Sequence, residues 1–170
     1  YYPYSTLASH VIGFLDGDNR GAYGLEALYQ DELEGSTGLV ITTKDVNALQ
    51  YEQYYDAEDG NSLQLTLDSN IQYYLERGLE DMIAKYGATN GAAGVVMDPR
   101  SGAILAIASS PTYDINDHHA IYDELLQADL ARTEEEYPDG PDGAHSDEYL
   151  EKLTELQYRQ WRNKATNDTY

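Results

Sequence analysis

Two short apolar runs joined by a turn constrain the fold of this chain more than any other feature. Residues 91–98 (GAAGVVMD) and 102–110 (GAILAIASS) are connected through Pro99 and Arg100. A Gly-containing turn between two such runs predicts an antiparallel β-hairpin. Both runs are apolar throughout, which is typical of strands covered on both faces. We therefore expect a larger sheet with helices over it, of which this chain supplies a part.

The segment before this hairpin carries the clearest helical pattern. Apolar residues recur at helical spacing over residues 70–86, and Gly87 ends the repeat. Ser69, followed three residues later by Gln72, forms a capping box at the helix start. Immediately upstream, residues 62–68 (SLQLTLD) alternate Leu with polar residues, which predicts a half-buried strand. A strand, a helix and a hairpin are thus expected in succession.

Weaker patterns predict the remaining elements and place the chain in the α+β class. We expect a domain boundary near residue 60, where the composition turns polar. In chain order, the elements are a short helix or helix-to-strand segment at 5–15, a helix at 24–34, a strand at 39–46, a tyrosine-rich connector at 47–61, and helices at 119–131 and 146–163 around an acidic loop.

Composition excludes several classes of function. The chain has 170 residues, enough for one ordinary domain or two small ones, and its formal net charge is −21. So acidic a chain lacks the clustered Lys and Arg that nucleic acid or anionic lipid requires. Cysteine is absent, which excludes disulfides, a thiolate nucleophile and Cys-based zinc sites. No apolar run approaches the length of a membrane span.

No common catalytic signature occurs in the chain. Ser-x-x-Lys, Ser-x-Asn, Lys-Thr-Gly, Gly-x-Ser-x-Gly, the Walker loop, Gly-x-Gly-x-x-Gly and His-Glu-x-x-His are all missing. An acylating serine enzyme needs an activated nucleophile, and none can be assigned here. We therefore predict no catalytic residue, no cofactor and no resident metal for this chain.

Three weaker clusters have structural interpretations that we favour. His10 lies in an apolar stretch without a partner nucleophile, which favours a hydrogen-bonded structural histidine. The turn DINDHH favours a loop and helix cap over a divalent metal site, and acidic pairs in a polar loop favour a solvated face over acid–base catalysis. The residues concerned are Asp114, Asn116, His118 and His119 in the turn, and Glu134 with Glu135 and Asp139 with Asp142 in the loop.

The stretch DGDNRGAYGLE at 16–26 partly matches a calcium-binding EF-hand loop. Asp16, Asp18 and Gly21 fit the first, third and sixth positions. The fifth position is the cation Arg20, and the twelfth is Ala27 where the pattern requires Glu. The residues alone leave an impaired calcium loop and a polar turn as alternatives.

Three stretches together resemble one family, the class B penicillin-binding proteins, membrane-anchored transpeptidases that cross-link the bacterial cell wall. The first is YPYSTLASHVIGF at 2–14 and the second is GAYGLE at 21–26. The third joins LTLDSNIQ at 65–72 to VVMDPRSGAILAIASSP at 95–111. The resemblance selects a set of structural motif residues, namely Tyr2, Pro3, His10, Gly13, Arg20, Gly21, Gly24, Leu25, Glu26, Asp68, Gln72, Asp98, Gly102 and Asn116.

The resemblance implies a division into two parts. Residues 1–60 correspond to the pedestal, or dimerisation domain, and residues 61–170 to the start of the transpeptidase domain. RNKA at 162–165 is similar to the approach to the family's catalytic Ser-x-x-Lys, which would follow Tyr170. The chain is then a non-catalytic part of a protein on the extracytoplasmic side of the bacterial membrane, anchored by a span outside it. The connector between Val46 and Tyr51 is shorter than the family's.

The same resemblance implies partners and a role for Glu26. Partners would be wall-synthesis proteins such as a glycosyltransferase, whereas β-lactams and the peptidoglycan stem peptide would bind only through the absent catalytic part. Glu26 becomes a structural anion that seeks Arg20 or an arginine outside the chain. Unpaired strand edges predict self-association. The alternative is a free-standing acidic extracellular binding module that depends on calcium, and calcium would then raise its melting temperature.

Overall fold

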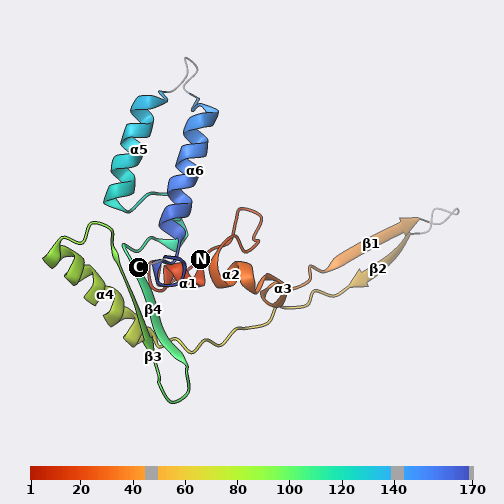
Figure 1. Cartoon of the computed structure of the whole chain (residues 1–170). Coiled ribbons are helices and arrows are strands. Elements are labelled where there is room, and N and C mark those ends of the chain that lie inside the picture. Colours follow the sequence, from red (N-terminus) through yellow and green to blue (C-terminus); the bar gives the residue numbers. More distant parts are fainter. Residues whose placement is uncertain (45–49, 139–143, 169–170) are drawn as a thin grey trace.

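The computed structural model describes residues 1–44, 50–138 and 144–168, and it has the α+β class expected from the sequence (Figure 1). Two separate two-stranded sheets are present in this part of the chain. The elements are α1 (Ser9–Ile12), α2 (Gly24–Leu28), α3 (Gln30–Leu33), β1 (Leu39–Lys44), β2 (Gln50–Tyr55), α4 (Ser69–Tyr86), β3 (Ala92–Met97), β4 (Ile104–Ser110), the 3-10 turn η1 (Ile115–Asp117), α5 (Glu124–Glu136), α6 (Asp147–Trp161) and α7 (Lys164–Asn167).

The hairpin expected at 91–110 is present as β3 and β4. The two strands pair antiparallel from Ala92 opposite Ser110 to Met97 opposite Ile104, with an irregularity after Val96. The residues of β4 from 106 to 110 are buried, but β3 is partly open, because Met97 is 56% exposed. The expectation that both strands are buried is therefore correct for β4 and wrong for β3, which is covered by α4 on part of its length only.

Helix α4 confirms the strongest helical pattern, but its start differs from the expected one. The N-cap is Asp68, whose side chain accepts hydrogen bonds from the backbone N–H groups of Asn70 and Ile71. The capping box from Ser69 to Gln72 was therefore a wrong assignment. Gln72 is buried instead and bonds to the backbone of β4. The Asp68 carboxylate, one residue earlier, caps the helix because it reaches the N–H groups two and three residues further on, which have no partner within the helix.

The strand expected at 62–68 does not form. This segment is extended but makes only isolated bonds to β4, from Thr66 Oγ1 to the Ile104 carbonyl and from the Asp68 N–H to the Leu105 carbonyl. Leu65 is 41% exposed. A β-strand requires a continuous ladder of backbone–backbone hydrogen bonds to a neighbouring strand. Of the two hydrogen bonds from this segment to β4, only the one from Asp68 joins two backbone groups.

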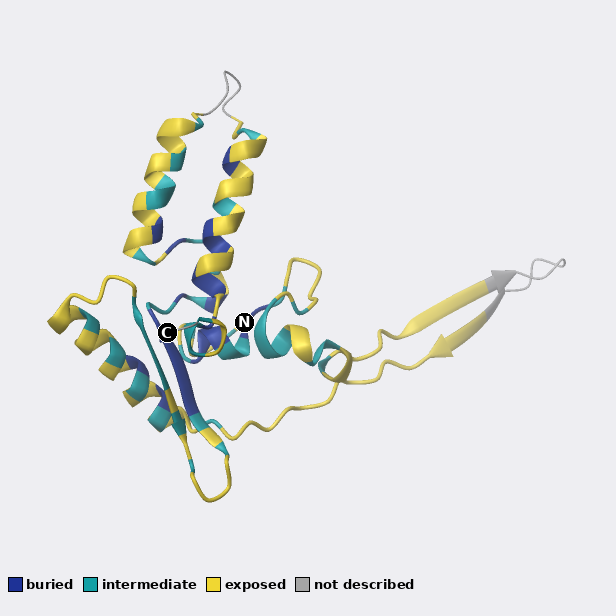
Figure 2. Ribbon diagram, in the orientation of Figure 1, coloured by how far each residue is buried: buried dark blue, intermediate teal, exposed yellow. Residues whose placement is uncertain are grey.

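The connector expected at 47–61 was also wrong in part, because β2 lies within it. β2 pairs antiparallel with β1, from Leu39 opposite Tyr55 to Lys44 opposite Gln50. Tyrosine favours strands, and its abundance here outweighs the polar composition that suggested a loop. The shortened connector inferred between Val46 and Tyr51 falls largely on residues 45–49, which lie outside the described residues. The β1–β2 hairpin projects from the rest of the chain, and residues 39–42 and 52–55 within it are exposed (Figure 2).

The other helices form with shifted bounds. The helix expected at 24–34 is split into α2 and α3 at Tyr29, whose backbone leaves the helical region. α5 begins later than expected because the Asp123 carboxylate caps it, accepting from the N–H groups of Leu125 and Leu126. α5 and α6 run antiparallel as a two-helix arm (Figure 1). Their shared seam contains Ile121, Leu126, Leu130, Leu153 and Leu156.

Candidate functional site

Three parts of the chain that are far apart in the sequence meet in one aromatic core, which we call the junction. The junction consists of Phe14, Tyr113, His118 and Trp161. The ring of Phe14 stacks on that of His118 with centroids 3.8 Å apart, and it meets the Trp161 ring at 4.8 Å. Tyr113 is fully buried and Phe14 is 3% exposed. The only Phe and the only Trp of the chain therefore hold the N-terminal segment against β4 and α6.

Backbone and side-chain hydrogen bonds reinforce the junction at its N-terminal edge. The Asn116 side chain bonds to both backbone groups of Tyr2, because its Oδ1 accepts from the Tyr2 N–H at 2.9 Å and its Nδ2 donates to the Tyr2 carbonyl at 3.0 Å. The Ile115 N–H donates to the Ser5 carbonyl. Two of the predicted motif residues, Tyr2 and Asn116, are therefore direct partners. Pro3 follows Tyr2 directly and begins the series of turns that leads into α1.

His10 is a buried titratable residue between the N-terminal segment, Tyr113 and the end of α6. Its side chain is 5% exposed, its Nε2 lies 3.1 Å from the Gln160 carbonyl, and its ring meets Tyr113 edge-on with centroids 5.1 Å apart. Burial lowers the pKa of His10 from 6.5 to about 4, and the nearby Lys164 adds to the effect. A neutral imidazole that donates to a backbone carbonyl fits this environment.

This environment predicts a pH dependence of stability that His10 carries. The unfolded chain binds a proton at His10 below pH 6.5, whereas the folded chain resists it until about pH 4. Lowering the pH from 7 to about 5 should therefore reduce the free energy of unfolding by about 2 kcal/mol through this residue. Urea unfolding of the original chain and of His10→Gln at both pH values measures the difference. An equal loss in both proteins would contradict the assignment.

Two glycines close the turn between α1 and α2. Gly13 has φ 77° and ψ −160°, and Gly24 has φ 64°. A Cβ at Gly13 would lie 1.9 Å from the Tyr23 carbonyl oxygen, and one at Gly24 would lie 2.7 Å from the Gly13 Cα. The two backbones approach too closely for any other residue. These two motif glycines therefore set the path of the chain into the junction.

Glu26 pairs with a different group from the one expected. Its Oε1 accepts from the hydroxyl of Tyr2 at 3.2 Å. Burial and the Glu26 carboxylate raise the pKa of Tyr2 to about 12. Arg20 is exposed, and within residues 1–44 no ion pair joins it to Glu26, so of the two expected partners Arg20 is not the one that pairs here, whereas an arginine outside the chain stays a prediction. Arg20 belongs to a short loop that separates it from the helix carrying Glu26.

The loop at 16–21 has its own polar contacts. The Asp16 Oδ1 accepts from the backbone N–H groups of Asp18 and Arg20, both at 2.9 Å. Gly21 donates its N–H to the Gln30 side chain. Within residues 1–44, 50–138 and 144–168, no three His, Asp or Glu side chains converge to form a metal site. These hydrogen bonds give the stretch the geometry of a polar turn, and its response to calcium stays a prediction for the melting experiment.

A second contact fixes α4 on the hairpin. Gln72 is 1% exposed and bonds to both backbone groups of Ile107, from its Nε2 to the carbonyl and from the Ile107 N–H to its Oε1, both at 2.9 Å. Gln72 Nε2 also donates to Glu76 Oε1, which accepts the Ala8 N–H at 2.8 Å. Gln72 and Glu76 thus connect the N-terminal segment, α4 and β4. Glu76 was not predicted from the sequence, where the available signal was its position one helical turn after Gln72.

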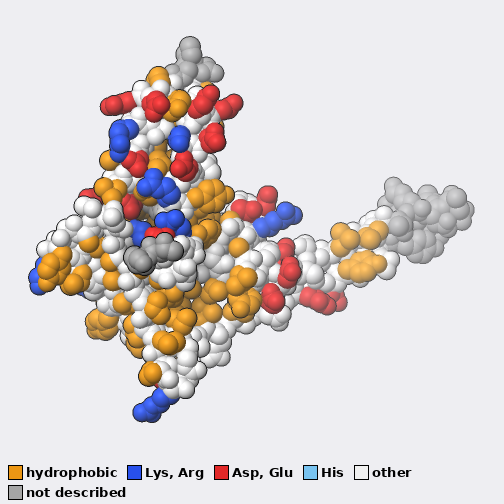
Figure 3. All heavy atoms as spheres, in the orientation of Figure 1, with side chains coloured by type: hydrophobic (Ala, Val, Ile, Leu, Met, Phe, Trp, Pro, Cys, Tyr) orange, Lys and Arg blue, Asp and Glu red, His pale blue; other side chains and the backbone are white. Residues whose placement is uncertain are grey.

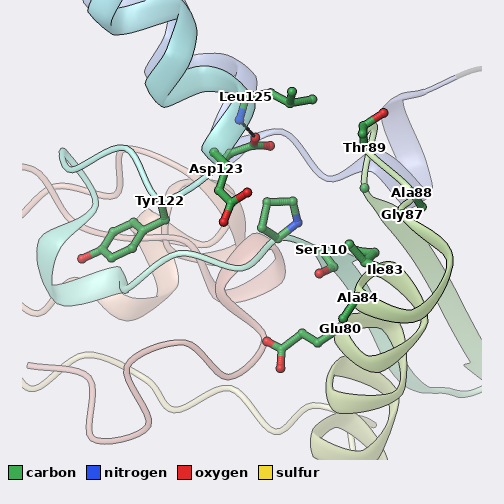
Figure 4. Close-up of a pocket in the computed structure, with 13 residues that line it drawn as sticks. Glu80, Ile83, Ala84, Gly87, Ala88, Thr89, Ser110, Tyr122, Asp123 and Leu125 are labelled. Carbon is green, nitrogen blue, oxygen red and sulfur yellow. Dashed lines mark hydrogen bonds between the residues drawn. The ribbon is translucent and has the colours of Figure 1, made fainter.

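The end of the β3–β4 hairpin opposite its turn, the C-terminal part of α4 and the start of α5 border a hollow of about 500 Å³ (Figure 4). Ile83, Ala84 and Leu125 provide apolar contacts, and Glu80 extends its carboxylate at the lower edge in this view. Asp123 also borders the hollow, but its carboxylate caps α5. In Figure 3, hydrophobic side chains gather over the lower body, while acidic groups gather on the arm.

Comparison with known proteins identifies the family. The chain is 37% identical over 134 residues to the stage V sporulation protein D of Bacillus subtilis, covering 76% of this chain and 21% of that protein. It is 33% identical over 118 residues to the peptidoglycan D,D-transpeptidase FtsI of Escherichia coli, covering 68% and 20%. The crystal structure of penicillin binding protein 3 from Mycobacterium tuberculosis matches with a TM-score of 0.56 and 30% identity, covering 69% and 23%.

The chain belongs to the class B penicillin-binding proteins. It spans about a fifth of the length of the curated relatives it matches. No family model matches the chain. Among the helices of the described residues, none has both the length and the apolar character needed to cross a bilayer.

The motif RNKA at 162–165 docks on the end of the β3–β4 hairpin. Asn163 is 8% exposed, and its Oδ1 accepts from Ser109 Oγ and from the Ala165 N–H. The Lys164 N–H donates to Ser109 Oγ, and its Nζ donates to the carbonyls of Asn90 and Ser110. Arg162 pairs with Asp168 at 2.7 Å. This cluster holds the chain close to β4 as it leaves α6.

Other residues predicted from the sequence lie away from the junction. Asp98 and Gly102 shape the β3–β4 turn, where the Asp98 side chain accepts from the Arg100 N–H and from Ser101 Oγ. Leu25 lies on α2 and is partly buried. Asp114 caps η1 through the Asn116 N–H, and the rings of His118 and His119 lie tilted and edge-on to Trp161, with centroids 6.0 Å and 6.2 Å away. Glu134 and Glu135 are exposed on α5, whereas Asp139 and Asp142 lie outside the described residues.

Proposed function

We propose that this chain is the non-catalytic framework of a peptidoglycan transpeptidase, which positions the catalytic domain and contacts other wall-synthesis proteins. The observation that carries the proposal is the junction, where Phe14 from the N-terminal segment packs between His118 and Trp161. Residues 1–60 are then the pedestal portion, and residues 61–170 are the start of the transpeptidase domain. The junction fastens one to the other.

The cluster around RNKA supports the positioning role. Asn163 and Lys164 bond to Ser109 and Ser110 at the end of β4. A chain segment held by several buried or partly buried hydrogen bonds has a fixed direction, which a catalytic group downstream of it would need. We place this framework on the extracytoplasmic side of the bacterial membrane, anchored by a span outside the chain.

The β1–β2 hairpin supports a contact role. Leu39, Val40 and Tyr54 are 54%, 54% and 67% exposed, and an isolated two-stranded hairpin is marginal in water. Exposed apolar side chains on a projecting hairpin are typical of interaction surfaces. A glycosyltransferase of wall synthesis, or a second copy of the chain, would cover them.

Labelled penicillin tests the non-catalytic role. We expect no covalent adduct on the 170-residue chain, because it contains no Ser-x-x-Lys whose serine could be acylated. A penicillin-binding protein with a complete transpeptidase domain, labelled in the same gel, is the positive control. A band at the mass of this chain that resists denaturation would overturn the proposal.

A further inference from the structure

Two hollows adjoin along one face of α4, and both are bordered by Glu80. The first, of about 330 Å³, lies between α4 and the segment before α1, with Tyr4 and Tyr73 on its walls and Glu76 among its lining. The second is the hollow of about 500 Å³ between α4 and the start of α5 (Figure 4). Glu80 borders both, and we call the face of α4 that carries the two hollows the α4 trough.

A buried carboxylate faces the first hollow. Glu76 is 8% exposed, and its Oε1 accepts from Ala8 and Gln72, which are neutral donors. No hydrogen bond to its Oε2 and no ion pair of Glu76 is found in the part of the chain that the structure describes. Burial raises the pKa of Glu76, the hydrogen bonds from Gln72 and Ala8 lower it in part, and the charge of Glu80 raises it again. A cation at Oε2 would relieve this cost, because buried charges are stable when paired.

The charge of the α4 trough is negative and only partly compensated. Glu76, Glu80 and Glu124 border it without an ion pair within the described ranges, whereas Asp123 lies 4.0 Å from Lys164. Arg77 is the one cation among the lining residues, and its guanidinium donates to the Tyr73 hydroxyl. The chain as a whole carries a formal charge of −21. The complementary ligand is therefore cationic.

The spacing of the carboxylates and the apolar walls sets further requirements. Glu76 and Glu80 are one helical turn apart, which separates their Cβ atoms by about 6 Å. Alternate side chains of an extended peptide are separated by about 6.6 Å and point to one face. Beyond Glu80, Ile83, Ala84 and Leu125 form an apolar patch, and Leu125 is 44% exposed. An extended segment with two alternate cations followed by an apolar residue matches this order.

We propose that the α4 trough binds an extended basic segment of a partner protein with the pattern Lys-x-Lys-x-Leu. The first ammonium group pairs with Glu76 Oε2 and the second with Glu80. The Leu side chain packs on Ile83 and Ala84, and the rings of Tyr4 and Tyr73 contact the aliphatic part of the first Lys. The pattern gives the trough a direction, from the N-terminal loop toward the start of α5.

The probe is the peptide acetyl-Gly-Lys-Ser-Lys-Ser-Leu-Gly-amide, titrated into the intact chain by calorimetry at about 0.15 M salt. We expect Glu76→Gln to weaken binding about tenfold or more and Glu80→Gln about threefold. Glu135→Gln, on the exposed face of α5, is the matched control and should leave Kd unchanged. The peptide acetyl-Gly-Lys-Lys-Ser-Ser-Leu-Gly-amide has the same composition but adjacent Lys residues, and it should bind more weakly.

Several results would overturn this inference. They are the absence of binding, an equal effect of Glu135→Gln, and equal affinities of the two peptides. Either of the last two results would mean that the peptide binds only through the overall negative charge of the chain. Circular dichroism checks that Glu76→Gln keeps its fold, because Glu76 accepts two hydrogen bonds. Should that variant unfold, Glu80→Gln decides alone, since Glu80 makes no side-chain hydrogen bond within the described residues.

Discussion

Trp161→Ala is expected to lower the free energy of unfolding by about 4 kcal/mol, the usual range for truncating a buried aromatic residue. Trp161 is 7% exposed, its ring contacts Phe14, and its Nε1–H donates to the His118 carbonyl at 2.8 Å. Truncation removes this packing and leaves the carbonyl without its donor. Urea unfolding followed by far-ultraviolet circular dichroism measures the change.

Tyr158→Ala is the matched control for this experiment. Tyr158 lies on the same helix, is 58% exposed and touches Trp161 only edge-on at 5.3 Å. Its truncation should cost about 1 kcal/mol or less. Equal losses in the two variants would mean that Trp161 does not hold α6 to the N-terminal segment, and the junction would have to be abandoned.

Gly13→Ala is expected to lower the free energy of unfolding by about 3 kcal/mol or more. The conformation of Gly13, with φ 77° and ψ −160°, belongs to a region occupied almost only by glycine. The added Cβ would also lie 1.9 Å from the Tyr23 carbonyl oxygen, so the turn between α1 and α2 must open. Phe14, the next residue, would then leave its position between His118 and Trp161.

Gly78→Ala, in contrast to Gly13→Ala, is expected to stabilise the chain. Gly78 lies inside α4, and an added Cβ would meet nothing within 4 Å. Alanine there should raise the free energy of unfolding by about 0.5 to 1 kcal/mol, because it reduces the entropy lost on helix formation. Thermal and urea unfolding of both variants test the contrast. A loss below about 1 kcal/mol for Gly13→Ala would show that the turn adapts easily.

Local patterns predicted the elements whose signals are strong and self-contained. The helix at 70–86 has a long 3.6-residue repeat, and the hairpin at 91–110 has two apolar runs around one turn, so both formed as α4 and β3–β4. The period-two pattern at 62–68 failed because alternation makes a strand only where a neighbouring strand pairs with it. β2 was missed because its polar and tyrosine residues lack the apolar face by which strands are recognised.

The junction could not be derived from local patterns. Tyr2 and Asn116 were named from the family resemblance, but their contact spans 114 residues of sequence, and no spacing rule reaches so far. For Glu26, charge alone favoured an arginine, whereas the fold brings the hydroxyl of Tyr2 to it. Phe14 and Trp161 were not selected at all. Their rarity in a chain with 17 tyrosines was the one available signal.

Native-state hydrogen exchange tests the central claim that the N-terminal segment and the hairpin fold as one unit. Three amides report on it, because the Ala8 N–H donates to Glu76, the Ile107 N–H to Gln72 and the Ile115 N–H to Ser5. We predict that all three exchange with the same opening free energy, and that Trp161→Ala lowers the three values together. Fast exchange at Ala8 and Ile115 with full protection at Ile107 would contradict the claim.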